Sequence, residues 1–206
     1  MENAGENGNK LKGTRIRTAN YLMILAASIL YLFILYGMFQ ISSQYNDLLR
    51  TTDKLVSCEE IATNIADGSN ILTEQVRLYA VTAETEYMEA YFQEANVDKK
   101  RESALEELSK LPEADEIHTY LQTALGQSNE LMKSEIYAMR LVSEAKHYDI
   151  GTLPEEVQEI TLSKEDQALD EDGKIEKAQE LVFGYEYRES KEEILDNISN
   201  SLKVVL

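Results

Sequence analysis

The sequence predicts an all-α protein in which an N-terminal transmembrane helix continues into an elongated antiparallel up-down four-helix bundle. Glycine (9) and proline (2) are scarce among the 206 residues, and few turn-forming residues mean few turns and long helices. An uninterrupted apolar segment lies near the N-terminus, and apolar residues recur at helical spacing after it. A β architecture would need a turn every 8–12 residues or so, and the sequence does not supply these turns.

The apolar segment covers residues 21–41, and eleven of its 21 residues are Leu, Ile or Phe. As a helix it would span roughly 31 Å, which matches the hydrocarbon core of a bilayer. A cleaved signal peptide is the alternative, but it would need a shorter apolar core and a small-residue cleavage site. The residues that follow, 40–45, offer no such site. The segment therefore predicts an uncleaved transmembrane anchor.

Charge predicts the orientation of this anchor and excludes one class of partner. Basic residues lie at positions 10–17, just before the apolar segment, and Asp47 is the first charged residue after it. The positive-inside rule places residues 1–20, a basic tail, in the cytoplasm and residues 42–206 outside the plasma membrane. The net charge is −18; residues 1–20 carry +2 and residues 21–41 carry none, so residues 42–206 carry −20. Such a surface repels nucleic acid.

The first helix of the predicted bundle covers about residues 42–81. It carries a heptad repeat, with core positions three and four residues apart, at Leu48, Thr51, Leu55, Cys58, Ala62, Ile65, Ser69, Leu72, Val76 and Tyr79. Cys58 falls within this repeat, so it is interpreted as a small core residue. It is also the only cysteine, which excludes an intrachain disulfide and a thiolate metal site. Residues 81–85 break the repeat and are predicted to form a turn.

Three further helices are predicted, at about residues 86–110, 113–147 and 174–206. Pro112 separates the first two, because proline disfavours helix in the residue before it. Residues 148–173 form the connection to the last, with a short helix near Pro154 and a capping pair at Ser163 and Asp166. Short connections favour antiparallel neighbours. The last four residues, 203–206, resemble the approach to a second transmembrane span, so we expect the natural chain to continue into one.

Two stretches of this sequence resemble a known family. Val76-Arg77-Leu78-Tyr79-Ala80-Val81-Thr82-Ala83-Glu84, followed by Tyr87 and Tyr91, is similar to a segment of the extracytoplasmic four-helix-bundle sensor domains of bacterial transmembrane signalling proteins. Ala178, Tyr185, Tyr187, Lys191 and Ile194 are similar to the start of the returning helix in those domains. Ala83-Glu84 stands where the family often has Gly-Asp. The resemblance covers most of residues 15–206.

This resemblance implies a homodimeric receptor in which binding of a small-molecule or protein ligand outside the membrane shifts a helix. The family includes the input domains of chemotaxis receptors, sensor histidine kinases and diguanylate cyclases. The resemblance therefore implies a cytoplasmic output domain, of diguanylate cyclase or chemotaxis signalling type, that this chain does not include. The chain itself is then not an enzyme.

The residues themselves also offer no constellation for catalysis. The two histidines, His118 and His147, would lie about 44 Å apart along one helix and cannot share a metal. No catalytic residue, metal site or cofactor is therefore predicted. The acidic stretch 165–172 could bind a divalent cation, but its spacing lacks the order of a calcium loop, which favours a solvated acidic loop.

Ligand binding is the better prospect. Arginines among aromatic residues can hold a carboxylate while stacking against the rest of a small ligand. Residues of this kind gather toward the predicted outer end of the bundle: Arg77, Tyr79, Arg140, Tyr185 and Arg188, with Tyr137 and Tyr187 nearby. The alternative is that each arginine pairs with a neighbouring carboxylate and each tyrosine fills the core.

Two functions follow from the sequence. The first is the membrane-anchored sensory input module of a bacterial signalling protein. The second is a complete membrane-anchored interaction protein of the cell envelope, which would transmit no signal.

Overall fold

The computed structural model of the chain describes residues 5–111 and 115–204. These residues form helices joined by short connections, without a β-strand among them, so the predicted all-α class is confirmed. The chain divides into two compact units, residues 1–53 and residues 54–206.

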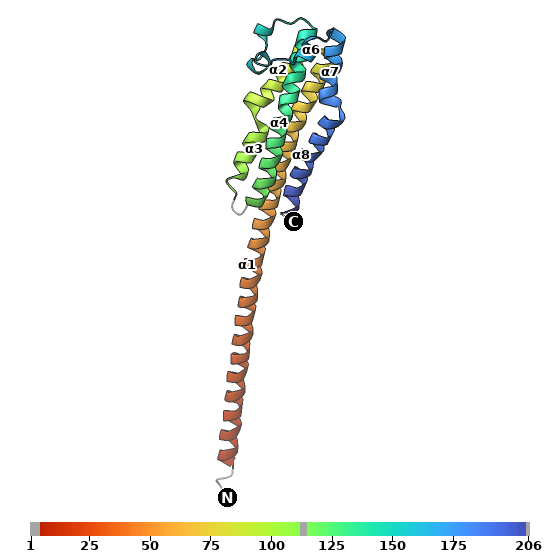
Figure 1. The fold of residues 1–206 in the computed structure, drawn as a ribbon. Coiled ribbons are helices and arrows are strands. Elements are labelled where there is room, and N and C mark those ends of the chain that lie inside the picture. The colour runs from red at the N-terminus through yellow and green to blue at the C-terminus, as the bar shows by residue number, and fades with distance from the viewer. Residues whose placement is uncertain (1–4, 112–114, 205–206) are drawn as a thin grey trace. The chain divides into compact units, whose positions relative to one another are not determined.

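The first unit contains the N-terminal part of α1 (Gly5–Thr82), which is red to orange in Figure 1. Residues Thr18–Ser42 of this helix are long and apolar enough to span a membrane, with a mean hydropathy of 2.3, and none of that window is buried. The predicted apolar segment is therefore helical over its full length, and its large apolar side chains are exposed in the isolated chain.

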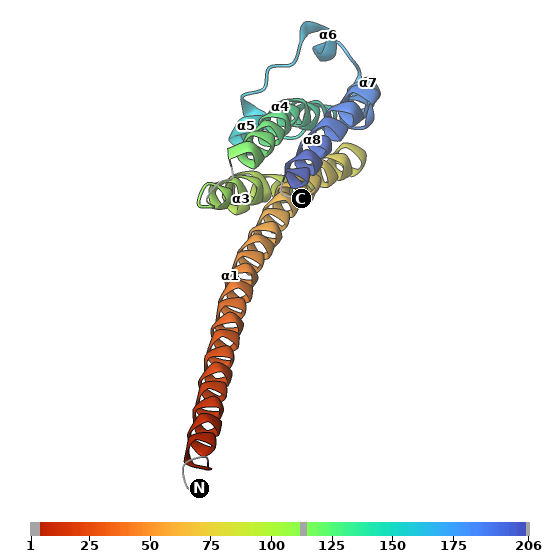
Figure 2. The same ribbon diagram turned by 90° about the horizontal axis from the view of Figure 1, so that it is seen from below.

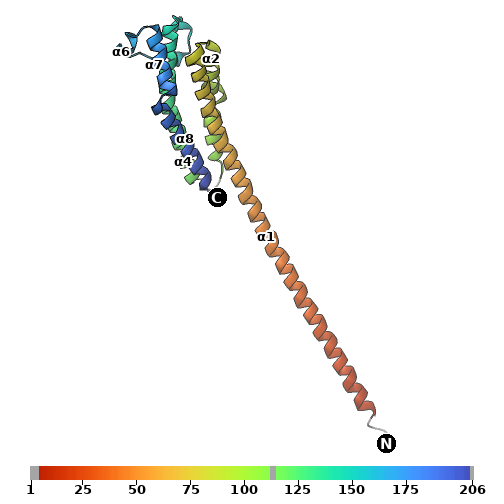
Figure 3. The same cartoon turned by 90° about the vertical axis from the view of Figure 1, so that its right-hand side faces the viewer.

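The second unit contains the rest of α1, α2 (Thr85–Gln93), a π-helix η1 (Glu94–Asp98), α3 (Lys100–Leu108) and α4 (Asp115–Ala145). After them come a 3₁₀ turn η2 (Ile150–Thr152), α5 (Glu155–Gln158), α6 (Lys164–Gln167), α7 (Glu171–Phe183) and α8 (Tyr185–Lys203). The helix α4 packs along both α7 and α8 (Figures 1 and 2). Figure 3 shows α2 beside the part of α1 that belongs to this unit.

The heptad repeat of α1 points into the core of the second unit from Cys58 onward. Its buried members are Cys58, Ala62, Ile65, Ser69, Leu72, Val76 and Tyr79. Leu48, which lies in the first unit, is 63% exposed. The repeat therefore predicts the core correctly in the second unit from Cys58 onward, whereas its first position, Leu48, is exposed.

The predicted turn at residues 81–85 is present, because α1 ends at Thr82 and α2 begins at Thr85. Ala83 has a left-handed backbone with a φ of 59°. Its carbonyl accepts a hydrogen bond of 2.6 Å from the Tyr148 hydroxyl. This bond ties the turn to the connection that follows α4.

The second predicted helix, 86–110, is wrong as a single element. The α-helical pattern gives way to the π-helix η1, and Lys99 then adopts a left-handed φ of 47° before α3 starts. The Glu94 carboxylate accepts a hydrogen bond of 3.1 Å from the Lys100 backbone N–H, which stabilises this irregular join. Pro112 and the predicted helix start at Glu113 lie outside the described residues.

The last predicted helix, 174–206, is also divided in two. It begins earlier, at Glu171, because the Asp170 side chain accepts a hydrogen bond from the Gly173 N–H and caps α7. It is then interrupted at Gly184, whose ψ of 174° is extended. A side chain at this position would place its Cβ 2.3 Å from the Glu180 carbonyl oxygen, so the break requires glycine. Residues 205–206 lie outside the described part.

The connection predicted at residues 148–173 agrees with the structure better than those two helices do. Pro154 precedes the short helix α5, and Ser163 caps α6 by accepting a hydrogen bond of 3.0 Å from the Asp166 N–H. Both features therefore confirm what the local sequence predicted.

Candidate functional site

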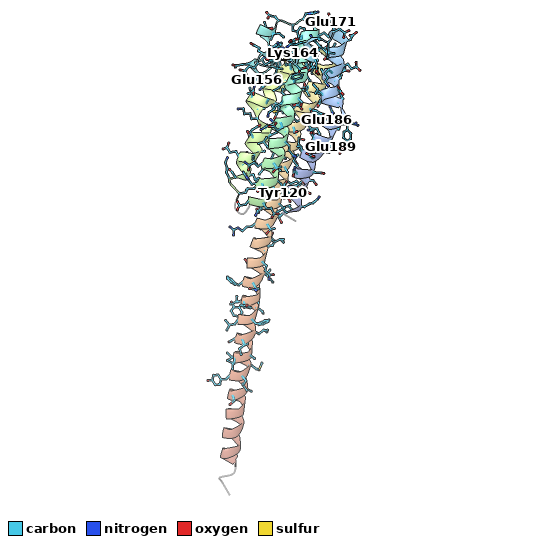
Figure 4. All side chains as sticks on the ribbon, viewed as in Figure 1. Tyr120, Glu156, Lys164, Glu171, Glu186 and Glu189 are labelled. Carbon is cyan, nitrogen blue, oxygen red and sulfur yellow. The ribbon has the colours of Figure 1, made fainter. Side chains whose placement is uncertain are left out.

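A layer of buried polar side chains crosses the core of the second unit. It draws residues from α1, α2, α3, α4 and α8, and we call it the polar layer: Ser69, Thr73, Tyr91, Arg101, Ser128, Glu135, Tyr187 and Lys191. Figure 4 draws the side chains on the ribbon and labels Glu186 and Glu189, which belong to α8. Those glutamates are exposed, whereas the charged residues of the layer are shielded from water.

Glu135 of α4 is the acceptor at the centre of one half of the layer. It is 2% exposed, and its carboxylate accepts hydrogen bonds from the hydroxyls of Tyr91, at 2.6 Å, and Tyr187. The Tyr187 hydroxyl also lies 3.0 Å from Thr73 Oγ1 on α1. Burial raises the pKa of Glu135, and the hydrogen bonds from the two tyrosines oppose this rise. One carboxylate thus connects α2, α4 and α8.

Arg101 of α3 lies in the other half and is 1% exposed. Its Nη1 donates to Ser128 Oγ at 2.7 Å, and its Nη2 forms an ion pair of 3.1 Å with the partly exposed Glu102. Nη2 also lies 3.2 Å from the sulfur of Met132. The guanidinium group of Arg101 is therefore held between α3 and α4.

Lys191 of α8 completes the layer from the opposite side. Its Nζ donates to the hydroxyl and the carbonyl of Ser69, at 2.8 and 3.2 Å, and lies 3.3 Å from Asn70 Oδ1. The Ser69 hydroxyl is in turn 3.3 Å from that of Ser128. Burial lowers the pKa of Lys191 to about 8, and the nearby Glu135 carboxylate opposes this shift. The two halves of the layer thus meet through two serines.

The electrostatics of Lys191 give a testable dependence of stability on pH. Its folded-state pKa of about 8 lies below its ordinary value of 10.5, so between these values the unfolded chain holds a proton that the folded chain has released. Stability rises with pH wherever the unfolded state binds more protons. We expect the free energy of unfolding of the wild type, minus that of Lys191→Met, to increase from pH of about 8 to about 10. This gain in stability is lost again as the pH falls back through the folded-state pKa of about 8.

The measurement is urea unfolding of the full chain in detergent micelles, followed by circular dichroism at several pH values. Lys133→Met is the matched control, because Lys133 is exposed and forms its ion pair with Glu130 on the same helix. The same pH dependence in wild type and Lys191→Met would show that Lys191 keeps its proton in the folded state.

Glu94 and Gly68 form the edge of the layer beside Arg101. Glu94 is 3% exposed, and its Oε2 has no hydrogen-bond partner among the described residues, although Lys100 Nζ lies 4.0 Å away. Gly68 of α1 faces both side chains. A Cβ at position 68 would lie 2.7 Å from Arg101 Cγ and 2.9 Å from Glu94 Oε1. Glycine therefore permits α1 and α3 to approach closely at this level.

Gly68→Ala is expected to lower the free energy of unfolding by about 1–3 kcal/mol, because the added methyl group overpacks the contact with Arg101. Gly126→Ala is the matched control: it is also helical, but a Cβ there meets nothing within 4 Å. The control should gain about 0.5–1 kcal/mol from helix propensity alone. Urea unfolding of both variants measures the difference, and equal effects would contradict the close approach at Gly68.

The structure separates the five ligand-binding residues expected from the sequence. Arg77 is half-buried and lies at the break between α7 and α8, where its Nε donates to the Val182 carbonyl at 2.9 Å. Tyr185 is 69% exposed and Arg188 is also exposed, both in the first turn of α8 just after this break. These three residues therefore come from the same region of the fold.

The other two lie elsewhere and already have partners. Tyr79 is buried, and its hydroxyl is 2.8 Å from Ser143 Oγ. Arg140 forms an ion pair of 3.0 Å with Glu144 and donates to the carbonyls of Val157 and Gln158. Arg140 thus has the neighbouring carboxylate partner of the alternative interpretation, whereas Arg77 bonds a backbone carbonyl instead.

Two other candidate residues from the sequence also have polar partners within the fold. The Tyr137 hydroxyl donates to Asp166 at 2.5 Å, and His147 Nε2 lies 2.8 Å from a carboxylate oxygen of Glu171. Across the residues that the structure describes, no group of three or more His, Cys, Asp or Glu side chains could hold a metal ion.

Sequence reasoning did not single out Glu135 and Arg101 as functional candidates, although one signal was available for Glu135. Leu121, Ser128, Glu135 and Val142 follow one another at intervals of seven residues on α4. Two polar residues therefore occupy consecutive core positions of an otherwise apolar repeat, which is the sequence signature of a polar layer. Arg101 belongs to a run of charged residues that looks like a solvated face, and only the structure shows that it is buried.

The chain was compared with protein-family models, with curated proteins and with solved structures, and none of them matches it. The polar layer and the apolar segment Thr18–Ser42 are therefore the features on which a function is proposed.

Proposed function

We propose that this chain is the membrane-anchored sensory input module of a bacterial transmembrane signalling protein. The observation that carries this proposal is the polar layer, which places one carboxylate and two cations inside the core of a helical unit. Buried charged groups of this kind are seldom the most stable solution, because apolar residues of the same volume often stabilise a core as well or better. Groups with perturbed pKa values concentrate at functional sites.

The proposed fold is an antiparallel up-down bundle of four helical segments. The segments are α1 from Lys54 onward, α2 with α3, α4, and α7 with α8. Direct bonds support this arrangement: Tyr79 joins α1 to α4, Lys191 joins α8 to α1, and Arg101 joins α3 to α4. In such a bundle all four segments contribute side chains to the polar layer, so movement of one segment alters the contacts of the others.

The proposed topology has the apolar segment Thr18–Ser42 crossing the plasma membrane, with the N-terminus in the cytoplasm. The basic residues at positions 10–17 support this orientation. Residues 42–206 then lie outside the membrane, where a strongly acidic surface is well solvated. In that arrangement the second unit meets ligands that do not enter the cell.

The proposed ligand is a small molecule that carries a carboxylate. Arg77 contacts the break between α7 and α8, and Tyr185 and Arg188 follow this break directly in the chain. Arginine side chains bind carboxylates in a bidentate manner. Exposed aromatic rings beside them offer an apolar surface for the rest of the molecule. Tyr79 and Arg140 are not part of this proposed site, because Tyr79 is buried and Arg140 already pairs with the carboxylate of Glu144.

The proposed receptor is a homodimer, and its output is of diguanylate cyclase or chemotaxis signalling type. The heptad positions of α1 before Cys58 support pairing with a second copy, since Leu48 is exposed in the single chain. The output would be carried by a cytoplasmic domain, so the second unit acts by binding and movement and not by catalysis.

A ligand screen tests this proposal. The full chain in lipid nanodiscs is heated in the presence of amino acids, organic acids and divalent cations, because a ligand that binds only the folded state raises the melting temperature. We expect a carboxylate compound to raise it by several degrees. Arg77→Ala should abolish that shift, whereas Lys133→Ala should preserve it. A screen without any stabilising compound would contradict the sensory function, and a shift unchanged in Arg77→Ala would contradict the site.

A membrane-anchored interaction protein is the second candidate. Exposed apolar side chains along α7 and α8 favour it, namely Phe183, Tyr185 and Leu195. It predicts that the chain captures an envelope protein through this face, that Tyr185→Ser and Leu195→Ser abolish capture, and that small ligands leave the melting temperature unchanged.

A further inference from the structure

The helical segment formed by α7 and α8 is broken at Gly184. The break removes the usual donors for the last carbonyl groups of α7. The Gly184 N–H bonds the Glu180 carbonyl at 2.8 Å, and the Arg188 N–H bonds the Gly184 carbonyl at 3.2 Å. Since a Cβ at position 184 would lie 2.3 Å from the Glu180 oxygen, the extended link is specific to glycine.

Arg77 of α1 contacts both sides of this break. Its Nε donates to the Val182 carbonyl, near the end of α7, at 2.9 Å. Its guanidinium carbon lies 5.0 Å from the ring centroid of Phe183 and 5.1 Å from that of Tyr187. A cation near a helix C-terminus and between two aromatic rings is stabilised by both. Phe183 ends α7 and Tyr187 belongs to the first turn of α8, so one side chain holds the two helices together.

The same break is connected to the polar layer. Tyr187 directs its hydroxyl to Glu135 and Thr73 while its ring lies against Arg77. The helix α7 has a separate attachment to α1, because Gln179 Nε2 donates to the Ala80 carbonyl at 3.1 Å. Loss of the Arg77 contacts would therefore leave α7 attached to α1 through Gln179, whereas the start of α8 would lose one of its contacts with α1 and depend more on the hydrogen bonds of Tyr187 to Glu135 and Thr73.

We propose that the α7–α8 break is a hinge and that Arg77 is the latch that holds it closed. A carboxylate ligand that binds the guanidinium must compete with the Val182 carbonyl and the two rings, so ligand binding and opening of the hinge are linked. This link rests on the proposed function, whereas the hinge itself does not. Opening moves Tyr187 away from Glu135 and loosens α8 against α1 and α4.

Hydrogen–deuterium exchange of the full chain in nanodiscs, without ligand, tests the hinge. In Arg77→Gln we expect the amides of residues 184–191 to exchange about tenfold faster, because a charged hydrogen bond and two ring contacts are lost. The amides of α4 should keep their wild-type rates. Arg140→Gln is the matched control, since Arg140 also holds backbone carbonyls; it should accelerate residues 155–160 and leave residues 184–191 unchanged.

Two further variants keep the test decisive. Phe183→Leu removes one ring and leaves the guanidinium, so it should accelerate residues 184–191 by a smaller factor, about threefold. Arg77→Lys keeps the charge and a donor, and it should restore protection in part. Uniform acceleration throughout residues 54–204 in Arg77→Gln would show a general loss of stability and would overturn the latch, as would unchanged rates at residues 184–191. Because no ligand is present, failure of the sensory function would leave these expected results unaltered.

Discussion

Glu135→Ala is expected to lower the free energy of unfolding of the second unit by about 3–5 kcal/mol, the usual effect of removing one partner from a buried charged network. The substitution leaves the Tyr91 hydroxyl without its acceptor and leaves the Tyr187 hydroxyl with Thr73 Oγ1 as its remaining partner. It also removes a carboxylate whose charge interacts favourably with the buried cations Lys191 and Arg101. Both consequences arise among buried side chains, where a lost hydrogen bond or charge interaction is costly.

Urea unfolding of the full chain in detergent micelles measures this effect. Glu130→Ala is the control, because Glu130 is exposed on the same helix and should change the free energy by less than about 0.5 kcal/mol. Glu135→Gln should lie between the two, since it keeps an acceptor for one tyrosine but removes the charge. If Glu135→Ala proved as mild as Glu130→Ala, the carboxylate would not be buried in a bonded network.

Arg101→Ala should destabilise the second unit by a similar amount, about 3–5 kcal/mol. It removes the donor to Ser128 and the ion pair with Glu102, and it leaves a cavity where a fully buried guanidinium was packed. Lys110→Ala is the control: Lys110 follows α3 closely, is exposed and pairs with Glu106. Its loss should change the free energy by less than about 0.5 kcal/mol.

A double-mutant cycle with Glu135→Ala distinguishes a connected layer from two separate sites. Arg101 and Glu135 interact electrostatically, so the double variant should be less destabilised than the sum of the single variants, by at least about 0.5 kcal/mol. Strict additivity would contradict the view that the two halves of the polar layer act as one network.

Much of the fold follows from local sequence patterns. The apolar segment and the heptad of α1 predict a continuous helix, and α1 extends from Gly5 to Thr82. The cap at Ser163 and the helix start after Pro154 are equally local, since each depends on residues a few positions apart. Such features can be predicted because the interactions that stabilise them are contained within a short stretch of chain.

The interruptions could not be predicted in the same way. The irregular join after η1 depends on a buried Glu94 and on the close approach of Gly68 from another helix. The break at Gly184 is contacted by Arg77 of α1, more than 100 residues earlier in the chain. Gly184 is the only glycine in residues 174–206, so the sequence marks the position of the break without indicating what stabilises it.

The candidate site, like the fold, could be predicted from the sequence only in part. Arg77 was identified from its aromatic neighbours in the sequence, but its partners are a carbonyl and two rings and not the carboxylate of the alternative interpretation. The polar layer was missed because its members are isolated polar residues on separate helices. Only the packing of those helices brings the side chains of Glu135, Arg101 and Lys191 into one core.

Measurement of the membrane topology is the sharpest test of the proposed sensor, because a sensor of external ligands must present its second unit outside the cell. Single cysteines are introduced at Glu189, on the exposed face of α8 (Figure 4), and at Asn9 in the basic tail. Cys58 is buried and can stay in place. In intact bacterial cells, a membrane-impermeant maleimide should label Glu189→Cys, and it should label Asn9→Cys only after the membrane is permeabilised. Labelling of Asn9→Cys in intact cells, with Glu189→Cys protected until permeabilisation, would place the second unit in the cytoplasm and contradict the proposed sensor.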